Sequence, residues 1–333
     1  MPHVAVIGAG ATGTRVARQL AHTWPDVEIT FVDDAAGAAE STARALGSNV
    51  RSVYSSSVPG HAEIVVIATR AGTHGHLAAA ALRTASLVVS IADAPGDVDS
   101  LLALDQRAQQ TETRIVVGAG MMPGLTDVLA GHGRRWFDEV REIHVSKFGT
   151  GGPDCARQHH RALKGICLDW RDGEWRRRAG GTGRELAWFP APVQAADCYR
   201  AALADPKLLL RQHPDVDRIT SRMAATRRDR LTMHLPMLRK PHPEGLLGAV
   251  RVELRGVKDG GHLEVVLGCA ERPAVGAGAV AASAVSALAN PTALSGEFGS
   301  RGLAEWVDPT AFLHSLKIRG LRPELFIGAD ETY

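Results

Sequence analysis

The 333-residue chain lacks the features that would direct it to a polyanion or a membrane. Its 38 Lys and Arg residues nearly balance 36 Asp and Glu residues, and the net charge of +2 excludes nucleic acid and anionic membranes as expected partners. No apolar run approaches the roughly 18 residues of a transmembrane helix. The first residues, Met1 to Ala5, do not resemble a secretory signal. We therefore expect a cytoplasmic protein.

Motifs for metal binding and for hydrolysis are also missing. The four cysteines, Cys155, Cys167, Cys198 and Cys269, lie too far apart for a CxxC pair. His74 and His76 have no third metal ligand at a recognisable spacing, so we expect no metal. The chain contains no GxSxG elbow, P-loop or HExxH motif. These absences exclude the commonest classes of hydrolase and phosphotransferase.

The first 120 residues alternate short apolar runs with longer helix-like segments. The apolar runs span residues 4–7, 28–32, 50–54, 64–67, 87–91 and 114–117. The helical segments between them span residues 14–21, 37–46, 73–82 and 97–110. This alternation predicts an α/β fold with a doubly wound, six-stranded parallel sheet, a Rossmann domain, over residues 1–124.

The pattern changes after residue 124 and predicts a second domain of α+β type. A helix over 125–136, a strand over 141–147 and an antiparallel pair over 249–255 and 262–267 are expected. The stretch 154–247 gives no clear elements. We assign 125–275 to substrate binding and dimerisation, expect a homodimer, and place a helix at about 276–290 back on the first domain, followed by an extension over 291–333.

The segment Gly8-Ala9-Gly10-Ala11-Thr12-Gly13 has the spacing of a dinucleotide-binding turn. It follows an apolar strand and opens a helix, which is the context that gives this short motif meaning. Gly8 permits the tight turn, Gly10 permits close approach of a pyrophosphate, and Gly13 permits helix–strand packing. The N–H groups at Ala11, Thr12 and Gly13 then face the phosphates. The alternative is that these glycines serve the fold alone.

Acidic residues after the second strand indicate which dinucleotide is bound. Asp33 lies 20 residues beyond Gly13, where a carboxylate accepts hydrogen bonds from the adenine ribose and repels a 2′-phosphate. Asp34 is an alternative ligand. These residues favour NAD. NADP stays an alternative, because Arg70 could reach a 2′-phosphate from a neighbouring loop.

Loops at the carboxyl ends of the later strands are expected to surround the rest of the cofactor. They include Thr69 and Arg70, then Asp93, then Gly120, Met121 and Met122. We expect Gly120 and Met121 to contact the nicotinamide. Asp93 is a candidate to hold a substrate ammonium, and its alternative is a helix-capping acid.

At this point the chain resembles the saccharopine dehydrogenase family. The family has a Gly-x-Asp-Pro-Gly turn where its two domains join, and Gly120-Met121-Met122-Pro123-Gly124 is similar to it. The segment from Ser146 to Pro153 is similar to the family's Ser-Tyr-Cys-Gly-Gly-Leu-Pro loop, with one residue more. Met122 replaces the family's aspartate. The resemblance implies hydride transfer at the C–N bond of an amino-acid-like substrate.

Basic residues of the second domain are candidates to serve such a substrate. Lys147, His160 and Asp93 are the predicted catalytic residues, and Lys147 is also a candidate carboxylate anchor. The predicted substrate-binding residues are Met122, His159, Arg161, Lys164 and Arg227.

The alternatives to these roles are structural. Lys147 would be a strand-edge lysine facing water, residues 159–164 a solvated helix, Arg227 part of a charged surface, and Met122 a packing residue. Two other functions stay open: a non-catalytic dinucleotide sensor, and a reductase of C=O or C=C bonds with Tyr199 as the acid.

Overall fold

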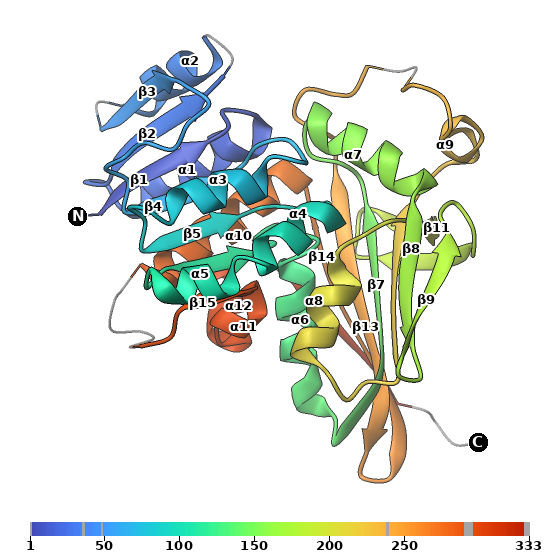
Figure 1. Cartoon of the computed structure of the whole chain (residues 1–333). Coiled ribbons are helices and arrows are strands. Elements are labelled where there is room, and N and C mark those ends of the chain that lie inside the picture. The colour runs from blue at the N-terminus through green and yellow to red at the C-terminus, as the bar shows by residue number, and fades with distance from the viewer. Residues whose placement is uncertain (1, 35–36, 48, 238–239, 290–295, 330–333) are drawn as a thin grey trace. The chain divides into compact units, whose positions relative to one another are not determined.

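The computed structural model in Figure 1 divides the chain into two compact units. It describes all residues except 1, 35–36, 48, 238–239, 290–295 and 330–333. Unit 1 comprises residues 1–120 and 274–307, and unit 2 comprises residues 121–273 and 308–333. The chain therefore leaves the first unit after residue 120 and returns to it near residue 274.

Unit 1 is built on a seven-stranded parallel sheet with the order β15-β6-β5-β4-β1-β2-β3. Its strands are β1 (His3–Ile7), β2 (Glu28–Asp33), β3 (Val50–Tyr54), β4 (Ile64–Ile67), β5 (Leu87–Ser90), β6 (Arg114–Val117) and β15 (Gly299–Gly302). The central strands are short apolar runs because helices cover both faces of the sheet. The predicted α/β class with a Rossmann domain is confirmed.

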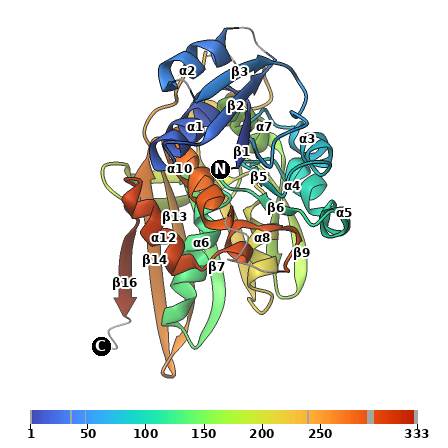
Figure 2. The ribbon, with the colours of Figure 1, turned by 90° about the vertical axis from the view of Figure 1, so that its left-hand side faces the viewer.

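Helices cover the two faces of this sheet in the doubly wound manner (Figure 2). They are α1 (Ala11–Thr23), α2 (Ala38–Leu46), α3 (His74–Ala81), α4 (Pro95–Leu102), α5 (Asp105–Gln110), α10 (Pro273–Leu288) and α11 (Leu303–Trp306). Helix α10 packs on α1, where a Cβ at Gly278 would lie 2.5 Å from the Cβ of Arg15. The single helix predicted over 97–110 is two helices, and the break lets the Asp105 carboxylate accept a 2.7 Å hydrogen bond from the Ser300 backbone in β15.

Unit 2 contains a nine-stranded mixed sheet. Its strands are β7 (Glu139–Phe148), β8 (Ile166–Arg171), β9 (Glu174–Ala179), β10 (Glu185–Phe189), β11 (Gln194–Arg200), β12 (Arg218–Ala224), β13 (Gly248–Lys258), β14 (Gly261–Glu271) and β16 (Glu324–Ala329). Strand β7 is parallel to β12 on one side and antiparallel to β13 on the other. It is therefore an interior strand of the sheet.

Helices α6 and α8 of unit 2 pack against its sheet (Figure 1). The helices of this unit are α6 (Leu125–Gly133), the 3-10 turn η1 (Arg134–Trp136), α7 (Pro153–Lys164), α8 (Asp205–Gln212), α9 (Arg227–Thr232) and α12 (Pro309–Ile318). A Cβ at Gly133 of α6 would meet Leu254 and Leu267, so the covered face is the apolar one. Ile143 and Val145 of β7 point to this face and are fully buried.

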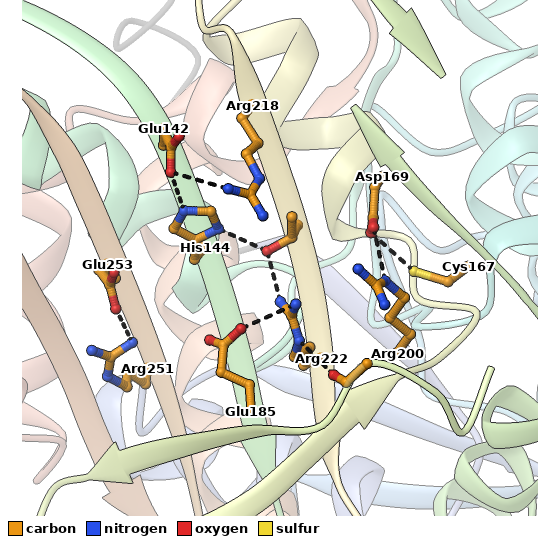
Figure 3. A network of polar contacts seen from close by, with 12 residues as sticks. Glu142, His144, Cys167, Asp169, Glu185, Arg200, Arg218, Arg222, Arg251 and Glu253 are labelled. Carbon is orange, nitrogen blue, oxygen red and sulfur yellow. Dashed lines mark hydrogen bonds and ion pairs between the residues drawn. The ribbon is translucent and has the colours of Figure 1, made fainter. Parts of the chain in front are cut away.

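The opposite face of the sheet carries charged side chains that alternate with the buried apolar ones. Glu142 and His144 on β7 lie beside Arg218 and Arg222 on β12, as Figure 3 shows. This alternation is the two-residue period of a strand whose two faces have different surroundings.

The C-terminal part of the chain is divided in a way that the predicted extension over 291–333 does not describe. Residues 299–302 form β15 on the edge of the unit 1 sheet, whereas α12 and β16 belong to unit 2. Residues 290–295 and 330–333, which also fall in the predicted helix and extension, lie outside the described residues. Among the helices that the structure describes, none is both long and apolar enough to cross a bilayer.

His213, at the end of α8, has a buried imidazole ring. Its ring is 4% exposed, and within the described residues neither ring nitrogen has a hydrogen-bond partner. Burial, with a smaller contribution from Arg134, lowers the pKa of His213 to about 4. The folded protein therefore holds this ring neutral at pH values where the unfolded chain protonates it.

We expect His213→Leu to flatten the loss of stability in acid. Because the folded pKa lies below the unfolded value of 6.5, the ring costs no stability above that value and up to about 3 kcal/mol as the pH falls to 4. Thermal unfolding of both proteins between pH 7 and pH 4 measures the difference. Parallel pH curves for the wild type and the variant would contradict the assignment.

Candidate functional site

The Gly8 to Gly13 turn joins β1 to α1 with no room for side chains at its first and last glycines. Gly8 has a φ of 102°, and its N–H donates a 2.8 Å hydrogen bond to the Val32 carbonyl. A Cβ at Gly8 would lie 2.5 Å from the Ala68 carbonyl oxygen, and one at Gly13 would overlap the Gly8 carbonyl. The fold itself therefore requires these two glycines.

Gly10 is different, because the fold alone gives no reason for it. Its φ of −71° and ψ of −173° are open to any residue, and a Cβ there would have no heavy atom within 4 Å. Gly10 is the N-cap of α1, next to the first backbone N–H groups of the helix, which have no intrahelical acceptor. An open space at a helix N-terminus fits a pyrophosphate, so Gly10 favours the cofactor reading over the fold-only alternative.

Asp33, the last residue of β2, lies against the same turn. Its Oδ2 accepts a 2.5 Å hydrogen bond from the Ala9 N–H, so this carboxylate both holds the turn and borders the space in front of it. Asp34 is exposed. Of the two predicted ribose ligands, Asp33 is the one that the structure fixes beside the turn.

The loop after β4, which contains Thr69 and Arg70, is held by a buried network. The His74 ring bonds the Thr69 carbonyl at 3.1 Å through Nε2 and Ser90 Oγ at 2.8 Å through Nδ1. The carbonyl only accepts, so Nε2 carries the proton and Nδ1 accepts from the serine hydroxyl. Burial lowers the pKa of His74, which keeps the ring neutral in this arrangement.

Asp97 at the start of α4 fixes the same loop from the other side. Its carboxylate accepts from the Gly72 N–H at 2.7 Å and from the His74 N–H at 3.2 Å. Thr69 is half-buried, and Arg70 is exposed. His74, Ser90 and Asp97 therefore position this loop. The sequence analysis considered His74 only as a metal ligand and did not single out Ser90 or Asp97.

The remaining predicted residues of unit 1 and the start of unit 2 follow β5 and β6. Asp93 is half-buried and does not cap α4, because Ala94 is the N-cap and makes no side-chain bond. Gly120, Met121 and Met122 are buried. The turn after β6 thus presents little exposed surface.

Lys147 occupies an unusual position in unit 2. It lies near the end of interior strand β7, on the apolar face with Val145, and pairs in register with Met223 and Val250. The residue is only 5% exposed. Among the residues that the structure describes, no carboxylate lies within ion-pair distance of its ammonium. The strand-edge interpretation of Lys147 is wrong, because β12 and β13 flank β7.

The predicted basic group on α7 is split by the turn of the helix. His159 is buried and lies one turn from Cys155, with His159 Nε2 3.6 Å from the sulfur. His160 Nε2 bonds the Leu235 carbonyl at 2.9 Å. Arg161 and Lys164 are exposed, which fits the solvated-helix alternative for these two residues.

Arg227, predicted to bind a carboxylate, is an exposed residue of α9. Its neighbour Arg230 has a structural role. The Arg230 guanidinium lies 4.3 Å from the centre of the Tyr199 ring and donates to the Gly181 carbonyl at 3.0 Å. Arg230 is therefore engaged by Tyr199 and Gly181, whereas Arg227 is exposed.

The charged face of the unit 2 sheet is a cluster that the sequence analysis missed (Figure 3). His144 Nε2 donates to Glu142 at 2.8 Å, and Arg222 pairs with Glu185 at 3.0 Å. Thr220 links the two pairs, because its hydroxyl accepts from Arg222 at 3.0 Å and donates to His144 Nδ1 at 2.7 Å. The alternating charged residues in β7, β12 and β13 are the signal that could have revealed this cluster.

Each acid on this face has a basic partner. Burial alone would raise the pKa of Glu253, but the guanidinium groups of Arg251 and Arg255 outweigh it and lower that pKa. For His144 the balance is the reverse: burial lowers the pKa of the imidazole and outweighs the Glu142 carboxylate, which raises it. The cluster is neutralised internally, as expected of an element that stabilises and specifies the sheet.

Comparison with known proteins identifies the first domain. Residues 3–119 match the model of an oxidoreductase family with an NAD-binding Rossmann fold. This match confirms the prediction of NAD as cofactor, and the first domain is that of an NAD(P)-dependent oxidoreductase.

Two solved structures share the fold of most of the chain. Apo saccharopine dehydrogenase (L-Glu forming) from Saccharomyces cerevisiae aligns with a TM-score of 0.74 at 13% identity, over 99% of this chain and 100% of that one. C. glutamicum DAP dehydrogenase in complex with DAP aligns with a TM-score of 0.54 at 14% identity, over 93% of this chain and 95% of that one. At these identities the likeness concerns the fold. The predicted homodimer stays a prediction.

We expect Gly10→Ala to abolish NAD binding while leaving the cofactor-free protein about as stable as the wild type. The new methyl group meets no protein atom but occupies the space that a pyrophosphate needs. Isothermal titration with NAD and thermal unfolding without it measure the two effects. Gly13→Ala is the matched control and should lower the melting temperature. Unchanged NAD affinity in Gly10→Ala would show that the turn serves the fold alone.

Asp33→Ala should weaken NAD binding by roughly tenfold or more and reduce the preference for NAD over NADP. The substitution removes a charge-assisted acceptor for the ribose hydroxyls and the repulsion of a 2′-phosphate. Asp34→Ala, which removes the same charge from an exposed neighbour, is the control. Equal effects of the two substitutions on the ratio of NAD and NADP affinities would refute the assignment of Asp33.

Proposed function

We propose that this chain, whose residues 3–119 form the NAD-binding domain of an oxidoreductase, acts on the C–N bond of a small amino-acid-like substrate. The substrate is an amine or imine that bears at least one carboxylate. The first domain binds the dinucleotide, and the second domain supplies the groups that bind the substrate.

Lys147 is the observation that carries this proposal. Removing an ammonium group from water costs several kcal/mol unless an anion compensates it. Lys147 is buried, and within the described part of the chain no carboxylate accompanies it. A carboxylate that arrives with the substrate would supply the missing counter-charge.

Three other buried charges of unit 2 differ from Lys147 in having an ion-pair partner. Glu253, Arg222 and Asp169 are each at most 6% exposed, and each has an ion-pair partner within 3.0 Å. These three buried charges are thus paired. A largely buried cation without such a partner is a candidate for function.

Oxidation of an amine to an imine removes one hydride from carbon and one proton from nitrogen. Bound NAD would supply the hydride acceptor for the carbon of the amine. The nitrogen loses a proton at the same time, and a C=N bond forms between the two atoms. His160 stays the predicted proton acceptor and Asp93 the predicted partner of a substrate ammonium, while Lys147 binds the carboxylate.

The proteins that share the fold support this substrate class. The S. cerevisiae enzyme is described as L-Glu forming, and the C. glutamicum enzyme was solved with DAP bound. The sequence resemblance to the saccharopine dehydrogenase family points to the same bond. The bond specificity and the substrate are therefore proposals for this chain.

Matched pairs of substrates test the bond on which the enzyme acts. We would supply NAD or NADP with a panel of amino acids and with the 2-hydroxy acids of the same carbon skeletons, and follow reduced cofactor at 340 nm. In the reverse direction, keto acids with and without ammonia or an amino acid are compared. Turnover of hydroxy acids alone would refute C–N specificity, and NAD binding without turnover on any compound would favour a dinucleotide sensor.

Lys147→Met should raise the KM for a carboxylate-bearing substrate by roughly 10- to 100-fold, because a charge-assisted hydrogen bond is worth about 1.5–3 kcal/mol. The same change should leave the melting temperature equal or higher, since it replaces a largely buried lysine by an apolar side chain of similar size. Lys164→Met removes an exposed lysine of α7 and is the control. An unchanged KM in Lys147→Met, or a fall in melting temperature, would assign Lys147 to the fold.

A further inference from the structure

The four cysteines of the chain have different surroundings. Cys167, Cys198 and Cys269 are buried, and burial is the main cause that raises the pKa of each thiol to about 12. Each of these thiols stays protonated at neutral pH and is therefore a poor nucleophile. Cys155 is partly exposed. It is the one thiol of the four that a reagent in solution reaches.

Cys155 also has a base beside it. Its sulfur lies 3.6 Å from Nε2 of His159, one helical turn further along α7, where residues four apart share a face. The His159 ring is buried, so its position against the sulfur is fixed by the surrounding packing. An imidazole at this distance accepts the thiol proton and stabilises the thiolate that remains.

The start of α7 adds to this effect. The helix is twelve residues long with Gly152 as its N-cap, and Cys155 is its third residue. Backbone N–H groups in a first turn favour negative charge. The neighbouring Asp154 acts in the opposite direction, but its carboxylate is paired with Arg157 at 2.5 Å.

The loop that precedes α7 fixes the position of this turn. A Cβ at Gly245 would overlap the carbonyl oxygens of Thr150 and Gly151, so the two segments are in direct backbone contact. A Cβ at Gly149 would likewise lie 2.8 Å from Leu247 and Gly248. The first turn of α7 is therefore held in place from both sides, by this contact and by buried His159.

We propose that Cys155 and His159 form a nucleophilic thiol–imidazole pair, a modification site for soft carbon electrophiles and for peroxides. In alkylation by iodoacetamide, His159 takes the thiol proton, sulfur forms a bond to carbon, and iodide leaves. With hydrogen peroxide, sulfur attacks one oxygen and the O–O bond breaks. The departing hydroxide takes the proton from His159 and leaves as water, so sulfur is oxidised to a sulfenic acid and the peroxide is reduced. This inference does not depend on the proposed function.

Alkylation of the folded full-length chain at pH 7.5 tests the pair. Iodoacetamide is added to the wild type, His159→Gln and His160→Gln, and peptide mass spectrometry gives the labelling rate at each cysteine. We expect label at Cys155 alone in the wild type and a rate about tenfold lower in His159→Gln, equivalent to one unit in the acidity of the thiol. His160→Gln is the matched control, because His160 bonds the Leu235 carbonyl instead, and its rate should stay within about twofold of the wild type.

A folding control and a comparison with a free thiol complete the test of the Cys155–His159 pair. Thermal unfolding shows whether His159→Gln is folded; if it is not, the wild type is compared with N-acetylcysteine in the same buffer. Cys155 should react faster than this free thiol, and peroxide treatment should give a dimedone adduct at Cys155. Equal rates in the wild type and folded His159→Gln, or a Cys155 that reacts no faster than N-acetylcysteine, would overturn the pair.

Discussion

The close approach of α1 to the ends of β1 and β4 is the constraint on which the first domain depends. Gly8 and Gly13 allow it, because a single methyl group at either position would collide with backbone oxygen. The approach brings the start of α1 beside Asp33, and the hydrogen bond from Ala9 then fixes the turn. The cofactor site follows from this contact, since the helix N-terminus, the open space at Gly10 and the carboxylate all result from it.

The second domain shows how the fold treats charge on its two sheet faces. On one face, acids and bases alternate along adjacent strands and neutralise each other, so burial there costs little beyond the geometry of the pairs. On the other face, apolar side chains pack under helices, and Lys147 is a largely buried cation whose cross-strand neighbours are Met223 and Val250. The contrast separates charges that serve the architecture from one that the architecture alone does not explain.

The parts of the structure that sequence predicted are those encoded by neighbouring residues. The Gly8 to Gly13 spacing, the acid after β2 and the six apolar runs each specify local structure, and the parallel sheet follows from their order. The position of Lys147 could not be read in this way, because its burial depends on β12 and β13, which lie far along the chain. The i, i+4 spacing of Cys155 and His159 was visible, but the proximity of the two atoms was not.

The elements of segment 154–247 and strand β15 could not be predicted from the sequence, for related reasons. Strand β12 pairs with β7 and β8 across long separations, whereas β8–β9 and β10–β11 are hairpins whose exposed positions carry few of the apolar alternations that mark a strand. Gly299–Gly302 has the composition of a turn and becomes a strand only because the edge of β6 offers it partners.

The late return of β15 to the first sheet has a consequence for synthesis on the ribosome. Strand β6 ends at Val117 and β15 begins at Gly299, so β6 is an unpaired edge until roughly 180 further residues are made. At bacterial or eukaryotic elongation speeds this interval lasts about 10 to 40 s. During that time a nascent chain displays a row of open N–H and C=O groups beside an apolar strand, the arrangement that chaperones shield and that neighbouring nascent chains extend into aggregates.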